Sequence, residues 1–149
     1  MTMSVDVAAA VISHHFGWLL EKPFCANQFV EELPNSYGGD FDLVVTFTNR
    51  ATSVRVSITG IETEFWLCVR SVESPPPNPW SAELDIYEWA NFEGVGMETL
   101  LGVRTEGHLR SLCEASSNLC RRYPEYFLPG NFLLLQNKMM AMINARKEA

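Results

Sequence analysis

The sequence predicts an α+β fold: a three-stranded antiparallel meander packed on one face by N-terminal and C-terminal helices, in the order α-β-β-β-α-α-α. Residues 41–71 alternate apolar and polar side chains in three short runs joined by two tight turns. This is the pattern of an antiparallel sheet that is covered on one side. The stretches before and after it have helical periodicity instead. At 149 residues the chain is most simply one domain, spanning residues 1–149.

The stretch before the meander predicts one helix and a connection. Apolar residues recur at steps of three and four over residues 4–22, which is typical of an amphipathic helix, and Pro23 ends it. Residues 26–33 are expected to form a short connecting segment with a helical turn. Proline, asparagine and glycine in residues 34–39 indicate a loop.

In the meander, one set of alternating positions is apolar and the other is largely polar. We expect the apolar set to face the helices: Phe41, Leu43, Val45, Phe47, Val54, Val56, Ile58, Phe65, Leu67 and Val69. The opposite face carries threonine, serine and arginine together with Trp66. Trp66 is either an exposed anchor for a protein partner or covered by the proline-rich segment that follows.

After the meander, consecutive prolines at positions 75–77 predict a stiff extended crossing that cannot continue the sheet. Asp85 or Ser81 could cap a short helix within residues 80–94. Thr105 caps a longer helix that reaches Tyr123. A last helix begins after residues 129–131 and ends in basic residues that complement its dipole.

No pattern in the chain carries catalytic or metal-binding chemistry. The sequence contains no HExxH, GxSxG, GxGxxG or CxxC motif. His14 and His15 are adjacent, so on a helix they point about 100° apart and cannot share a ligand site. Cys113 and Cys120 fall on the apolar side of a helix, where thiols are inert. We therefore expect no catalytic residue, no metal and no cofactor, and four free thiols.

The composition favours a cytoplasmic protein. No run approaches the ~18–20 apolar residues that cross a bilayer. The N-terminal stretch lacks a positive region, carries Asp6 and is interrupted by His14 and His15, so we do not expect a signal peptide.

The formal net charge of −7 is distributed unevenly along the chain. Residues 1–100 hold fourteen acids and four bases, and no base lies between Arg70 and Arg104. This balance argues against nucleic acid or an anionic membrane as a ligand and is compatible with a basic partner. A solvated surface that keeps the protein soluble would explain it equally well.

Several stretches resemble a group of small bacterial proteins that act as immunity proteins of polymorphic toxin systems. They are the meander FDLVVTFTN–SVRVSITG–ETEFWLCVRS, then DIYEWANF, the helix GHLRSLCEASSNLCRRY and the tail YFLPGNFLLLQ. The tail is similar to an ending with a leucine pair, Gly-Asp and an aromatic residue, in which Asn131 replaces the aspartate. The resemblance spans residues 40–136 and rests on hydrophobic and turn positions.

The resemblance implies a non-enzymatic protein that binds a cognate toxin, often a basic nuclease, and blocks it by occlusion. An acidic contact edge would suit such a partner, because opposite potentials steer the encounter. The residues expected to make this contact are Glu83, Asp85, Glu88 and Glu93, with Trp66 and Trp80 as apolar anchors.

Two other classes of function stay open. An acidic secretion chaperone would hold an unfolded effector and would usually be a dimer. A small-ligand enzyme or sensor would need a pocket lined by polar groups. A toxin gene beside this one would favour the immunity role, and an export apparatus the chaperone.

Overall fold

The computed structural model describes residues 3–33, 42–50, 52–59, 63–71 and 83–148. Five strands form one antiparallel sheet, in which every strand pairs with its neighbours in the chain, in the order β1-β2-β3-β4-β5. They are β1 (Asn27–Leu33), β2 (Asp42–Thr48), β3 (Thr52–Thr59), β4 (Glu64–Ser71) and β5 (Glu83–Asp85).

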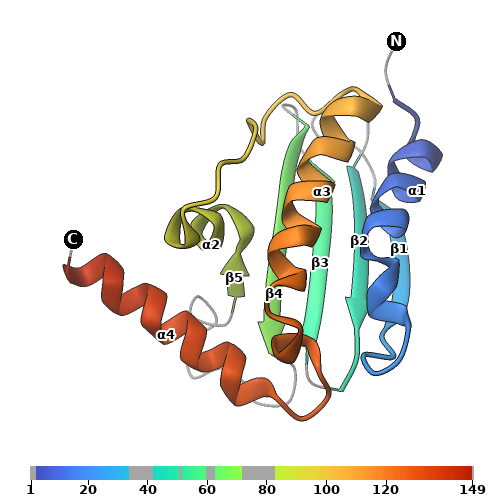
Figure 1. Ribbon diagram of the computed structural model, residues 1–149. Coiled ribbons are helices and arrows are strands. Elements are labelled where there is room, and N and C mark those ends of the chain that lie inside the picture. The colour runs from blue at the N-terminus through green and yellow to red at the C-terminus, as the bar shows by residue number, and fades with distance from the viewer. Residues whose placement is uncertain (1–2, 34–41, 51, 60–62, 72–82, 149) are drawn as a thin grey trace.

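Helices cover one face of this sheet. α1 (Val5–Phe16) and α3 (Glu106–Arg121) lie side by side across it, as Figure 1 shows. α2 (Ile86–Glu93) follows β5 at one edge of the sheet, and α4 (Phe132–Glu148) extends beyond this edge. The 3-10 helices η1 (Gly17–Leu20) and η3 (Pro124–Phe127) follow α1 and α3. The protein is thus a two-layer α+β structure.

The core lies between the sheet and the two covering helices. All the apolar meander positions that the structure describes are buried there, as predicted: Leu43, Val45, Phe47, Val54, Val56, Ile58, Phe65, Leu67 and Val69. Phe41 lies outside the described residues. Burial of each such side chain stabilises the fold by about 1.5–3 kcal/mol. The apolar stripe of α1 meets this face, and the rings of Phe16 and Phe47 pack 5.9 Å apart.

The expectation of three strands was wrong, because β1 and β5 extend the sheet at both edges. Residues 26–33 were expected to contain a helical turn, yet Asn27–Leu33 pairs with β2 in one unbroken register. β1 is an edge strand with water on both faces, so its sequence does not alternate as a half-buried strand does. β5 has three residues, paired with Cys68–Arg70, which is too short for any periodic signal.

The helices agree with expectation more closely. Asp85 caps α2 by accepting from the backbone N–H groups of Tyr87 (2.8 Å) and Glu88 (3.3 Å). Thr105 caps α3 through the N–H of His108 at 3.1 Å. The first helix is shorter than predicted, because regular α-helix ends at Phe16 and only η1 continues it. Gly17 stands at this change, and glycine has low helix propensity.

The side chain of Asn49 joins two chain segments, one after η1 and one after α3, at the same end of the sheet. Asn49, between β2 and β3, donates to the carbonyl oxygens of Phe24 (3.1 Å) and Phe127 (2.9 Å). Its own oxygen accepts from the N–H of Thr52 at 2.9 Å. The hydroxyl of Thr52 donates to the carbonyl of Tyr126 at 3.0 Å. This turn therefore fixes the segment after η1 and the segment after α3 to the same end of the sheet.

Replacing Asn49 by alanine is expected to lower the free energy of unfolding by about 1–3 kcal/mol, because partly buried backbone groups lose their partners. Urea unfolding followed by circular dichroism measures the change. The control is Asn118→Ala on the exposed side of α3, which should shift the value by no more than about 0.5 kcal/mol. Equal effects at both positions would contradict the role given to Asn49.

Candidate functional site

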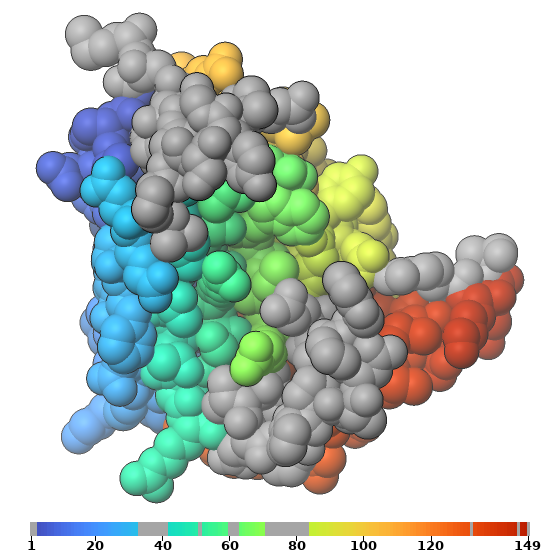
Figure 2. All heavy atoms as spheres, turned by 180° about the vertical axis from the view of Figure 1, so that it is seen from behind, coloured from blue at the N-terminus to red at the C-terminus, as the bar shows by residue number. Residues whose placement is uncertain are grey.

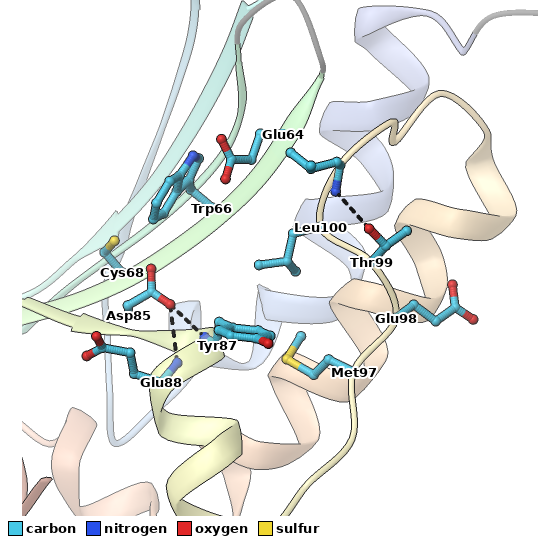
Figure 3. Close-up of a pocket in the computed structure, with 11 residues that line it drawn as sticks. Glu64, Trp66, Cys68, Asp85, Tyr87, Glu88, Met97, Glu98, Thr99 and Leu100 are labelled. Carbon is cyan, nitrogen blue, oxygen red and sulfur yellow. Dashed lines mark hydrogen bonds between the residues drawn. The ribbon is translucent and has the colours of Figure 1, made fainter. Parts of the chain in front are cut away.

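A groove of about 730 Å³ lies beside β4, near the edge of the sheet at which β5 leads into α2 (Figure 3). Its floor is formed by Glu64, Trp66 and Cys68, which alternate along β4 and therefore point to the same face. We call it the β4 groove. Trp66 is 40 % exposed, so a large aromatic surface is available at its centre.

The first turn of α2 closes one end of the β4 groove. Asp85 pairs with Cys68 in the β4–β5 register, and its carboxylate caps α2. That cap sets the direction in which α2 leaves the sheet and so places Tyr87 and Glu88 at the groove. Tyr87 lies in the first turn of α2, and its side chain is 49 % exposed.

The wall opposite is the connection between α2 and α3, at residues 97–101. Two backbone hydrogen bonds fix this connection to the start of β4. The N–H of Phe65 donates to the carbonyl of Leu100 (2.7 Å), and the N–H of Val103 donates to that of Thr63 (3.2 Å). His108 Nε2 lies 2.8 Å from the carbonyl of Thr99. From this wall Met97 and Leu100 point toward Tyr87 in Figure 3.

The chemical character of the β4 groove is aromatic and acidic. Four carboxylates line it, from Glu64, Asp85, Glu88 and Glu98, and none of the described lining residues is lysine or arginine. Glu98 points toward α3, where it accepts from the hydroxyl of Ser111 at 3.0 Å. The arrangement suits an apolar or aromatic contact surrounded by negative charge, a combination that a cationic surface or side chain can satisfy.

The structure brings together three of the residues expected to contact a partner. Trp66, Asp85 and Glu88 all line the β4 groove. Glu83 lies in β5 opposite Arg70, and its side chain is outside the description. Trp80 also lies outside the described residues. Of the four acidic residues expected to form the contact edge, Asp85 and Glu88 thus lie at the groove.

Glu93 lies elsewhere, at the end of α2, where its carboxylate is bound within the fold. It forms an ion pair with Lys138 of α4 and accepts from the hydroxyl of Tyr123 at 2.8 Å. The side chains of Glu93 and Lys138 are only 15 % and 10 % exposed. Lys138 Nζ also lies over the rings of Phe92 and Tyr123, 4.7 and 4.9 Å from their centroids. Glu93 thus attaches α4 to α2.

This ion pair makes stability depend on pH. Burial acts to raise the pKa of Glu93, but the hydrogen bonds from Lys138 and Tyr123 outweigh it and hold the pKa below its ordinary value of 4.5. A carboxylate with a lowered pKa in the folded state stabilises the fold above its unfolded pKa. That contribution is lost as the pH falls below 4.5 through the folded pKa.

Glu93→Gln is expected to lower the free energy of unfolding by about 1–3 kcal/mol at pH 7, because Lys138 stays largely buried without its counter-charge. The difference from the parent protein should shrink as the pH falls below 4.5, as measured by urea unfolding at several pH values. The control is Glu106→Gln, which breaks the exposed pair with Arg110 and should cost no more than about 1 kcal/mol. A pH-independent difference for Glu93→Gln would refute the assignment.

The four cysteines are free thiols in three different environments. Cys113 and Cys120 are buried on the inner side of α3, as predicted, and burial raises the pKa of each to about 12. Cys25 is exposed, and Cys68 is partly exposed on the floor of the β4 groove. Reactivity toward alkylating reagents should therefore separate them.

Iodoacetamide at pH 8 is expected to label Cys25 in the native protein and to leave Cys113 and Cys120 unmodified. A thiol of pKa about 12 is only about one part in ten thousand thiolate at that pH, and burial also blocks access. Mass spectrometry of the digested protein reads the labelling at each site. Both buried thiols should react after unfolding in urea, and their labelling before unfolding would contradict the described core.

Sequence reasoning missed the groove wall formed by Tyr87 and residues 97–101. Tyr87 was expected only as part of a helix. The pair Leu100-Leu101, in a segment without periodicity, was the available signal: apolar side chains there have no helix or strand face to bury them. Leu101 is 45 % exposed. The contact of this segment with β4 joins residues 35 positions apart, which no local pattern reveals.

Among the residues that the structure describes, no group of three or more His, Cys, Asp or Glu side chains is arranged to hold a metal ion. Within the same part of the chain, no helix has the length and apolar character needed to span a bilayer. Comparison with protein-family models, with curated proteins and with solved structures found no match. The resemblance to immunity proteins therefore stays a prediction.

Proposed function

We propose that the protein is a non-enzymatic protein-binding module of the immunity type, which binds a basic toxin domain through the β4 groove and blocks it by occlusion. The observation that carries the proposal is the lining of this groove. Exposed aromatic side chains lie there among four carboxylates, without lysine or arginine among the described lining residues. Sequence resemblance and groove chemistry thus support the same kind of partner.

Trp66 is the residue expected to contribute most to binding. Tryptophan is enriched at the energetic centres of interfaces, where a large apolar side chain is surrounded by a polar rim. Trp66 has this setting: it is 40 % exposed at the floor, with Glu64 beside it on the same face of β4. A lysine or arginine of the partner could contact the indole face and the carboxylates together.

The carboxylates are expected to act mainly on the rate of encounter. An acidic surface of this kind accelerates association with a basic protein, and added salt weakens the effect. The same charge repels phosphate groups, so nucleic acid and anionic membranes are not expected as ligands. Under this proposal the protein acts in the cytoplasm, has no cofactor and carries no catalytic residue.

The direct test needs a candidate toxin domain, and a toxin gene beside this one would supply it. Production of this chain should restore growth to cells that express the toxin, and the two purified proteins should form a complex in isothermal titration calorimetry. Trp66→Ala should weaken the complex by roughly 30-fold, equal to about 2 kcal/mol. Leu133→Ala, a change at an exposed apolar residue of α4, is the matched control and should leave affinity unchanged.

Charge reversal separates steering from anchoring. Glu64→Lys should lower the association rate by up to about tenfold at low salt and by less at high salt, as measured by stopped-flow fluorescence. Glu114→Lys, on the exposed side of α3, changes net charge by the same amount away from the β4 groove and should have a smaller effect. Equal effects would remove the groove from the proposal. Binding of the toxin only when it is unfolded would favour a chaperone instead.

A further inference from the structure

We infer that strand β1 is a self-association edge, through which two copies of this chain join their sheets into one antiparallel sheet of ten strands. The edge is at the opposite end of the sheet from the β4 groove, in the strand order β1-β2-β3-β4-β5. Self-association at this edge would therefore leave the β4 groove free and does not depend on the proposed function.

β1 presents an open strand edge. All seven of its residues pair with β2 in one continuous register, without a bulge, from Asn27↔Thr48 to Leu33↔Asp42. Among the residues that the structure describes, none forms a backbone hydrogen bond with the other edge of β1. Figure 2 shows the strand, in blue, along one margin of the sheet. A row of exposed N–H and C=O groups is a template for another strand.

Side chains on both faces of β1 are exposed at residues 29–32. Phe29 pairs with Thr46 on the outer face, and Val30 pairs with the buried Val45 on the helix side. Phe29 is 53 % exposed and Val30 51 %. The exposure of Val30 means that α1 does not cover this position on the inner face of β1. α1 contacts the same face at Gln28, whose amide donates to the hydroxyl of Ser13 at 2.6 Å. A second strand would pair with the backbone edge of β1 and not with this face.

β1 lacks most of the devices that keep natural edge strands apart. It contains no proline, no lysine and no bulge, and its only charged residues are Glu31 and Glu32. These two glutamates destabilise any strand pairing in which a glutamate of one strand lies directly opposite a glutamate of the other. They therefore select among the possible partners and registers.

Antiparallel pairing of β1 with its own copy, centred on Phe29, satisfies this restriction. Phe29 then lies opposite Phe29 of the second copy, Val30 opposite Gln28, and Glu31 opposite Asn27. No glutamate faces a glutamate, and the Asn27 amide can donate to the Glu31 carboxylate. Aromatic pairs across strands contribute about 0.2–1 kcal/mol beyond the backbone hydrogen bonds. The sequence of β1 is in this sense complementary to itself, so the partner strand belongs to a second copy of this chain.

The experiment measures the molar mass of the full chain by sedimentation equilibrium between about 1 µM and about 1 mM. The expected result is a rise from 16.8 kDa toward twice that value, because one strand pair with few side-chain contacts gives a weak, concentration-dependent dimer. Phe29→Lys should shift the midpoint to at least about tenfold higher concentration. Leu133→Lys, at another exposed apolar residue, should leave it unchanged. A mass of 16.8 kDa at every concentration would overturn the inference.

Cross-linking tests the register and does not depend on the lysine variant folding. In a Cys25→Ser background, Phe29→Cys should form a disulfide-linked dimer on oxidation, because the two Cα atoms lie about 4.5–5.5 Å apart at the centre of the pair. Glu32→Cys should not, since its two copies would be about 20 Å apart along the strands. Cross-linking at position 32 but not at 29, or equally at both, would contradict the Phe29-centred pairing.

Discussion

The apolar inner face of the sheet is the constraint on which the rest of this structure depends. The central strands present a continuous surface of buried valine, leucine, isoleucine and phenylalanine side chains. Such a face must be covered, and the chain covers it with α1 and α3, one from each side of the meander in sequence. Because both helices are used on this face, the other face of the sheet carries the polar and aromatic side chains, Trp66 among them.

The two edges of the sheet differ for the same reason. At the β5 edge the chain has to return to the helix layer, and α2 with the following connection passes beside β4 on the way. The β4 groove is the space that this return leaves. At the β1 edge the chain enters the sheet from α1 and requires no return, so this strand keeps an open side. The β4 groove and the open edge of β1 therefore both result from the path that the chain takes between the sheet and the helix layer.

The sequence predicted those elements that bury one face and failed where burial is absent or local pattern is short. The meander and the capped helices at Asp85 and Thr105 follow from periodicity and cap chemistry, and the structure confirms them. β1 was missed because both its faces meet water. In the site, Trp66, Asp85 and Glu88 could be proposed from residue type alone. The place of Glu93 could not, because its partner Lys138 is 45 positions away.

The frame of the β4 groove is maintained by main-chain atoms. The N–H of Phe65 and the carbonyl of Leu100, with Val103 and Thr63 beside them, determine the distance between wall and floor. Any residue type can supply the carbonyl of such a bond, and every residue type except proline can supply the N–H. Side chains at Glu64, Trp66, Met97 or Leu101 could therefore be exchanged during evolution without altering the width of the groove. A protein built in this way can acquire a different binding specificity by surface substitution alone, while its fold and stability stay nearly constant.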